Sequence, residues 1–132
     1  MKSFTISTIS RQQIIDINKQ VKDIVKDSKI KEGLCLIYTQ HTSAAVIINE
    51  NADPNIMLDI IDALSKVVPP GQWKHDKIDG NGDAHIKSTI LGPSKTVIID
   101  KGELQLGKWQ DIMLAEFDGP RKRTVLVKII ED

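Results

Sequence analysis

The chain of 132 residues carries 18 lysine and arginine residues and 18 aspartate and glutamate residues, so its formal net charge is zero. This length predicts one domain over residues 1–132, and the balanced charge argues against a nucleic-acid partner, because such proteins gather excess basic residues on one face. The single cysteine, Cys35, excludes an internal disulfide. No stretch approaches the roughly 20 apolar residues of a membrane span, and Met1–Ser10 lacks the apolar segment of a signal peptide, which favours a cytoplasmic location.

The N-terminal segment predicts a strand followed by a helix. Lys2–Ile9 is rich in serine, threonine and isoleucine with partial alternation, which is typical of a strand with one face toward water. From Arg11 to Ser28 apolar residues recur at helical spacing, so one stripe is expected to face the core. Ser10 and Gln13 fit the capping-box pattern and place the start of this helix at about Arg11.

Two strands and a second helix follow. Leu34–Thr39, which contains Cys35, and Ala44–Ile48 are compact apolar runs that predict buried strands, with the cysteine packed in the core. Asp53 is a helix N-cap with Pro54 at the first helical position. The expected buried stripe of this helix contains Ile56, Met57, Ile60, Ile61, Leu64 and Val68.

The C-terminal half begins with a polar loop. Gln72–Asp83 has almost no apolar periodicity, and loops of this length usually have a function. A short helix, Ala84–Leu91, is expected next. Four strands are then predicted at Thr96–Asp100, Glu103–Leu106, Gln110–Phe117 and Thr124–Ile130. Successive strands joined by short turns favour an antiparallel sheet with the two main helices packed on one side, an α+β domain.

All three histidines, His41, His75 and His85, lie in polar connections. Imidazole is the commonest zinc ligand, and three such ligands with one open position define a catalytic metal site. Their spacing contains no local ligand motif, so the residues alone leave open a shared site and three separate surface or capping histidines. Asp76 and Asp83 lie nearby in sequence and could bind Mg²⁺ or orient histidine ligands.

The segment from Asp79 to Asp83 mimics the opening of a calcium-binding EF-hand loop. Ala84 replaces the required glycine and Ile90 replaces the bidentate glutamate, which excludes an EF-hand. Ordinary turn chemistry is the alternative explanation, because aspartate, asparagine and glycine are the usual turn residues.

Three acidic or amide side chains are candidates for catalysis. Glu116 falls on the same side of its predicted strand as Ile112 and Leu114, which places a carboxylate among apolar neighbours. It is a candidate general acid/base or metal partner, or else a strand-end glutamate that reaches solvent. Asn49 and Glu50 follow an apolar run, where side chains often converge on a site, although they could simply begin the helix.

Candidate anion-binding groups lie beside the histidines. Thr42 and Ser43 follow His41 and could donate hydroxyl hydrogen bonds to an anion or form local turn bonds. Lys87 and Ser88 could bind phosphate one turn after Asp83. The basic run Arg121–Arg123 could do the same, although such runs are usually solvated.

Five sequence blocks also occur together in a known family. They are His41–Ala44, Asn49–Pro54, Asp83–Ser88, Leu106–Gln110 and Glu116–Arg121. In order and spacing they resemble the YjbQ-like family, the secondary thiamine-phosphate synthases. The resemblance implies an α+β subunit with an antiparallel half-barrel sheet, a homotrimer, and a shared, metal-binding site for the three histidines. Lys108 stands where family members often have threonine, which would change the charge of a site that this position lines.

The resulting hypothesis is a metal-dependent enzyme that acts on a small phosphorylated metabolite. The resemblance implies coupling of a pyrimidine pyrophosphate to a thiazole phosphate with release of pyrophosphate. The alternative is a non-catalytic trimeric module that binds a metal or small anion. The predicted metal ligands are His41, His75, His85, Asp76 and Asp83. The predicted phosphate-binding residues are Thr42, Ser43, Lys87, Ser88 and Gln110, and the predicted catalytic residues are Glu116, Glu50 and Asn49. Three imidazoles favour zinc, whereas carboxylates and phosphate also suit magnesium or manganese.

Overall fold

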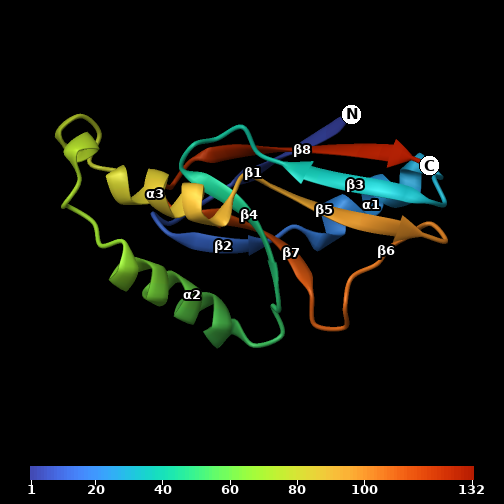
Figure 1. The fold of residues 1–132 in the computed structure, drawn as a ribbon, viewed down its shortest axis with the longest axis horizontal. Coiled ribbons are helices and arrows are strands. Elements are labelled where there is room, and N and C mark those ends of the chain that lie inside the picture. Colours follow the sequence, from blue (N-terminus) through green and yellow to red (C-terminus); the bar gives the residue numbers. More distant parts are fainter.

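The chain folds into two antiparallel sheets and three α-helices (Figure 1). A computed structural model describes all 132 residues. The strands are β1 Lys2–Ser7, β2 Gln13–Asp16, β3 Gly33–Tyr38, β4 Ala44–Asn49, β5 Ser94–Asp100, β6 Glu103–Leu104, β7 Asp111–Glu116 and β8 Lys122–Glu131. The helices are α1 Asn18–Ser28, α2 Pro54–Val67 and α3 Gly82–Leu91, with a 3-10 turn, η1, at Lys74–Lys77. The predicted α+β class is confirmed.

The two sheets differ in size and enclose the main core. Strands β1-β8-β3-β5-β6 form a half-barrel sheet, and β2-β7-β4 form a three-stranded sheet. Alternate residues of both sheets, such as Ile37, Val127 and Leu114, meet in one buried cluster. Val21 and Val25 of α1 join this cluster, so α1 closes the same core.

Helices α2 and α3 cover the other face of the three-stranded sheet. Ala84 of α3 packs with Ala45 and Met113 in a second buried cluster, against which Met57 and Leu64 of α2 are half-buried. No residue within α2 is fully buried. The one buried residue of the expected stripe is Val68, which lies just past the end of the helix. The predicted residues do form the inward-facing stripe of α2, but the expectation that all of them are buried was wrong. Those within the helix are half-buried, because α2 lies at the periphery with solvent along most of its surface.

The first predicted helix was wrong at its start. Gln13–Asp16 forms strand β2, which pairs with β7 in antiparallel register, and α1 begins only at Asn18. The side chain of Gln13 accepts a hydrogen bond from the Ile9 N–H at 2.9 Å in the preceding turn, so no capping box forms. Backbone pairing with a neighbouring strand outweighs a helical pattern that is compatible with either structure.

Cys35 lies in β3 with no exposed surface. Burial raises the pKa of its thiol to about 11. A thiol held protonated and covered reacts slowly, because the thiolate is the reactive form. We expect the native protein to react with a thiol-specific chromogenic reagent at pH 8 at least about 100-fold more slowly than the urea-unfolded chain. Equal rates in the two states would contradict the burial of Cys35.

An apolar patch on the outer face of the half-barrel sheet is exposed. Leu34 stands opposite both Ile98 and Ile130 in the strand register, and these two isoleucines are 60% and 50% exposed. This face therefore has no partner within the chain. None of the three α-helices combines the length and hydrophobicity that crossing a bilayer would require.

Candidate functional site

A buried ionic cluster connects α3 to the N-terminal segment. The carboxylate of Asp83 accepts hydrogen bonds from Arg11 Nη2 and from Lys87 Nζ, both at 3.0 Å. The side chains of Asp83 and Lys87 are 0% exposed. Lys87 Nζ also donates to Gln12 Oε1 at 2.9 Å and to Ser65 Oγ at 3.4 Å. All three ammonium donors of Lys87 are thus used inside the protein.

The charges of this cluster depend on one another. Burial by itself raises the pKa of Asp83, but the hydrogen bonds from Arg11 and Lys87 outweigh it and hold the pKa below its ordinary value. Asp83 is therefore an ionised carboxylate that fixes two cations. Asp83 thus positions Arg11 and Lys87 and is not free to bind a metal. Lys87 could bind a phosphate only by giving up its ion pair with Asp83.

A second buried pair joins Glu116 at the end of β7 to Arg123 in β8. Glu116 is 0% exposed on the face that it shares with Leu114, as its alternation predicted. Arg123 forks onto it, with Nε 2.8 Å from Oε1 and Nη2 bound to Oε2. Arg123 Nη2 also donates to Ser43 Oγ at 2.9 Å. Ser43 is therefore held by the pair rather than free for an anion.

The ionisation of Glu116 is set by these contacts. Burial raises its pKa, but hydrogen bonds from Arg123, the Asp118 N–H and Thr8 together bring the pKa below its ordinary value. A general acid at neutral pH needs the opposite shift. The solvent-exposed alternative for Glu116 was wrong, and so was the expectation that the whole basic run is solvated, because Arg123 is only 3% exposed.

The turn after β7 needs glycine for this pair to form. A Cβ on Gly119 would lie 2.2 Å from Ser10 O and 2.7 Å from Thr8 Oγ1. Thr8 Oγ1 in turn donates to Glu116 at 2.8 Å and accepts from the Arg121 N–H at 2.8 Å. Gly119 thus lets two chain segments approach closely enough to complete the hydrogen bonds of the buried carboxylate.

The structure brings two of the three histidines together. The rings of His75 and His85 are edge to face, with centroids 4.7 Å apart. His75 Nε2 lies 3.5 Å from Asp79 Oδ2. No group of three or more histidine, cysteine, aspartate or glutamate residues is placed to hold one metal ion. The three-histidine site expected from the resemblance therefore does not form within one chain.

His41 has a different environment. Its Nε2 accepts a hydrogen bond from the Thr124 N–H at 2.9 Å. Burial and the nearby Arg123 lower the pKa of His41, which favours the neutral ring. A neutral ring that accepts at Nε2 carries its proton on Nδ1. In this state His41 is a hydrogen-bond donor, suited to an anion, and not a metal ligand.

Asp76 orders the connection that carries His75. Its carboxylate accepts from the Trp73 N–H at 3.0 Å and from the Gly82 N–H at 2.7 Å, using both oxygens. A Cβ on Gly82 would lie 2.6 Å from Trp73 Cβ, so glycine is required where α3 begins. Asp76 is thus occupied by the backbone and positions the histidine pair.

Two buried polar atoms near the histidine pair lack a partner. They are Asn81 Oδ1 and Ser88 Oγ. Seven residues separate them, which places them on one face of α3, and His85 lies between them along that face. Asn81 Nδ2 donates to Asp118 Oδ2 at 2.8 Å, so this edge of α3 adjoins the Gly119 turn. A buried polar atom without a partner is costly, which makes this edge a binding candidate.

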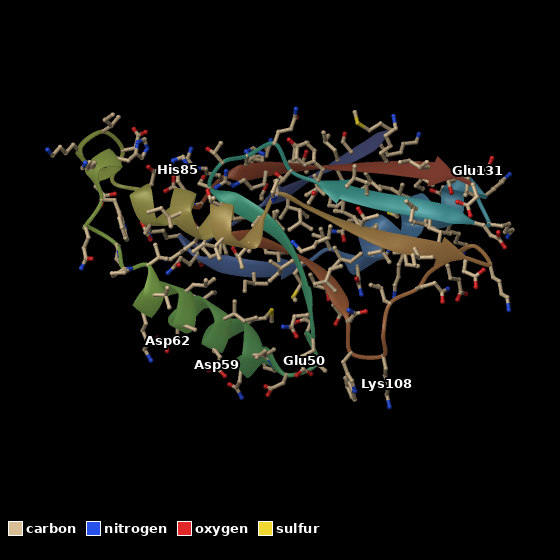
Figure 2. The ribbon with its side chains drawn as sticks, viewed as in Figure 1. Glu50, Asp59, Asp62, His85, Lys108 and Glu131 are labelled. Atoms are coloured by element: carbon tan, nitrogen blue, oxygen red, sulfur yellow. The ribbon has the colours of Figure 1, made fainter.

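The remaining predicted residues lie elsewhere. Asn49 ends β4 and Glu50 follows it, about 20 Å along the strand from Ser43, and Figure 2 shows Glu50 well apart from His85. Gln110 precedes β7 and its Oε1 accepts from the Gly107 N–H at 2.8 Å. Thr42 is exposed beside His41. Within one chain, Asn49, Glu50 and Gln110 therefore do not join the histidine pair.

Sequence reasoning missed several members of the buried clusters. Thr8 fell in a strand predicted to have one face toward water, Arg11 and Gln12 fell near the start of the first predicted helix, and no local pattern marks them. Arg123 could have been placed correctly, because it lies on the same face of β8 as the buried Val125 and Val127, at every second position.

Together, the fold and these contacts define a small α+β protein with paired buried charges and a histidine pair at one end of its sheets. The chain belongs to the family described as UPF0047 protein YjbQ-like, whose family model matches residues 2–132. The family part of the resemblance is therefore confirmed.

Relatives and solved structures agree with this assignment. The chain is 46% identical over 129 residues to a UPF0047 protein of Methanocaldococcus jannaschii, covering 98% of this chain and 93% of that protein. It is 41% identical over 133 residues to UPF0047 protein YugU of Bacillus subtilis, covering 98% of each. A crystal structure of a family member from Clostridium acetobutylicum matches with a TM-score of 0.94 at 44% identity, covering 98% of this chain and 100% of that chain. A YbjQ-like protein of unknown function from Sulfolobus solfataricus matches with a TM-score of 0.96 at 38% identity, covering 99% and 96%.

Proposed function

We propose that the protein is a metal-dependent enzyme that acts on a small phosphorylated metabolite, with thiamine-phosphate synthase-like group transfer as its reaction. The contact between the imidazoles of His75 and His85, beside the unpartnered Ser88, carries this proposal. The two facing imidazoles are donors that suit zinc, with its remaining ligands to come from water, the substrate or another subunit, and magnesium or manganese would suit added carboxylate and phosphate ligands. We also propose a cytoplasmic location, which suits a charged substrate that does not cross a bilayer unaided.

Each residue has a distinct role in this proposal. A bound divalent ion would supply charge neutralisation for a departing pyrophosphate. His75 and His85 would hold it, with Asp76 fixing their connection. His41 would donate from Nδ1 to a substrate phosphate, and the hydroxyl groups of Ser88 and Thr42 would add further donors.

The buried pairs would keep this region rigid. Glu116 has a depressed pKa and a full set of partners, which favours a role in holding Arg123 over the proton transfer suggested by the sequence. Lys87 similarly holds Asp83 in place. Preorganised polar groups are effective because they need no reorganisation when charge develops.

The competing function is a non-catalytic module that binds a metal or small anion. The lowered pKa of Glu116 favours it, because this carboxyl group is then not tuned to transfer protons near neutral pH. Either function is compatible with the homotrimer that we propose, and the exposed Ile98 and Ile130 supply an apolar face that association would cover.

Metal content is the first test. We expect zinc-loaded wild-type protein to retain about one ion per chain after dialysis, and His75→Ala/His85→Ala to lose it while remaining folded. The matched control, His41→Ala, should keep the metal, because His41 is not placed as a ligand here. Equal metal in the wild type and the double variant would refute the site.

Turnover separates the two functions. The metal-loaded protein should form thiamine phosphate from the two precursors and release pyrophosphate, and His75→Ala/His85→Ala should not. Metal binding without product, under conditions where a known thiamine-phosphate synthase reacts, would instead establish the binding module.

A further inference from the structure

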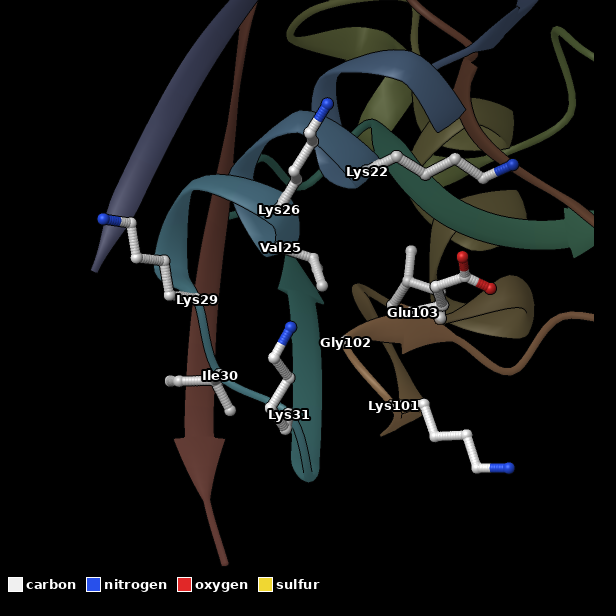
Figure 3. A pocket seen from close by; sticks show the side chains of 10 residues that line it. Lys22, Val25, Lys26, Lys29, Ile30, Lys31, Lys101, Gly102 and Glu103 are labelled. Carbon is white, nitrogen blue, oxygen red and sulfur yellow. The ribbon is translucent and has the colours of Figure 1, made fainter.

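A basic pocket lies between the end of α1, the connection to β3 and the β5–β6 hairpin (Figure 3). Its volume is about 570 Å³, within the range typical of small-molecule sites. Five lysines line it: Lys22, Lys26, Lys29, Lys31 and Lys101. Strand β5 runs from near the β3–β4 connection to this pocket, about 20 Å along its length, so the pocket is separate from the histidine pair.

The charge in this pocket is not balanced locally. Glu103 is the one acidic residue of its lining, and none of the five lysines forms an ion pair within 4.0 Å. The whole chain has zero net charge, yet five of its 18 basic residues gather here. A concave surface lined by one sign of charge focuses the electric field and attracts ions of the opposite sign.

The remaining lining is aliphatic. Val25 of α1 is buried, and Ile30 and Leu104 are half-buried around the same space. An apolar floor flanked by exposed lysine side chains can accommodate a ligand whose charged end meets the lysines and whose body meets the aliphatic side chains.

The walls of the pocket are tied together by the backbone. The Gly102 N–H donates to Lys31 O at 3.0 Å, which joins the hairpin to the connection before β3. Lys29 and Lys101 both adopt left-handed backbone conformations, with φ of 61° and 54°. Lys29, Lys31 and Lys101 therefore project from two tethered segments and Lys22 and Lys26 from α1, so the backbone that carries the five lysines is already in place.

We infer that this pocket binds a small molecule carrying several phosphate charges, the chemistry shared by nucleoside polyphosphates and inorganic polyphosphates. Lysine ammonium groups are compact point charges that suit phosphate oxygens approached from several directions. A singly charged carboxylate would leave most of the five ammonium groups without a partner. The concave shape and limited volume favour a small molecule over an extended acidic polymer.

Calorimetric titration of the full chain tests the inference, with ATP, inorganic triphosphate and a hexaglutamate peptide as probes. The pocket variant is Lys26→Gln/Lys29→Gln/Lys101→Gln. The control is Lys66→Gln/Lys122→Gln/Lys128→Gln, which removes the same charge from exposed positions outside the pocket. We expect saturable binding of a phosphate probe by wild type, weakened at least about tenfold in the pocket variant and less than about twofold in the control.

The probes distinguish the sources of phosphate. Tighter binding of ATP than of triphosphate supports a nucleotide whose body contacts the aliphatic floor, and equal binding supports a phosphate chain alone. No saturable binding of either, equal weakening in both variants, or tighter binding of hexaglutamate would each overturn the inference.

Discussion

Replacing Arg123 by methionine is expected to lower the free energy of unfolding at pH 7 by about 3–5 kcal/mol. The variant leaves the carboxylate of Glu116 buried without its cation, while Thr8 and the Asp118 N–H are its remaining donors. Urea unfolding of both proteins, followed by circular dichroism, measures the difference. A loss below about 1 kcal/mol would show that Glu116 does not depend on the pair.

The pH dependence gives an independent check on this pair. In the wild type the folded pKa of Glu116 is lowered, so its contribution is fully present above the ordinary glutamate pKa and is lost as pH falls through the folded value. Without Arg123, burial would raise that pKa, and protonation would relieve the unpaired charge. The deficit of Arg123→Met should therefore shrink toward acidic pH, and the double variant Glu116→Gln/Arg123→Met should lose less than the two single losses combined.

Replacing Asp83 by asparagine should cost about 3–5 kcal/mol, because the ammonium group of Lys87 then stays buried without its counter-ion. Arg11, which is partly exposed, can turn to solvent, whereas Lys87 cannot. Thermal and urea unfolding at pH 7 measure this loss. Asp79→Asn is the matched control, because Asp79 is mostly exposed and should change stability by less than about 0.5 kcal/mol.

Acid titration tests the ionic role of Asp83 independently. The folded pKa of Asp83 is lowered, so its stabilisation is complete above the ordinary aspartate pKa and disappears as pH falls through the folded value. Asp83→Asn removes this acid-dependent part, and its stability curve below pH 4 should be flatter than that of the wild type. Parallel curves for both proteins would contradict an ionic role for Asp83.

Much of the fold follows from local patterns in the chain. The apolar runs at β3 and β4 have no competing helical period, and Asp53 followed by Pro54 marks the start of α2 through local chemistry alone. Strand β2 could not be predicted in this way. Its residues fit either period, and pairing with β7, about 100 residues later, decides between them.

In the candidate site, too, local patterns predict some residues, whereas contacts between distant segments decide others. Alternation in β7 correctly placed Glu116 inside, and the same argument applied to β8 would have placed Arg123 on the buried face of its strand. The bond between Arg11 and Asp83 joins residues 72 positions apart, and no local pattern predicts it. The contact of His75 with His85, and the different partner of His41, likewise depend on how three connections are packed, which spacing along the chain does not encode.

The peripheral position of α2 has a dynamic consequence. Segments with few buried contacts open locally at a lower free energy than the sheets that support them. Ser65, a partner of Lys87 Nζ, belongs to this helix. When α2 opens, the ammonium group of Lys87 can exchange Ser65 for water while both sheets stay folded. The exclusion of water from Lys87 thus depends on α2 remaining in place. Hydrogen exchange at the Lys87 ammonium group is therefore expected to follow the local opening of this helix.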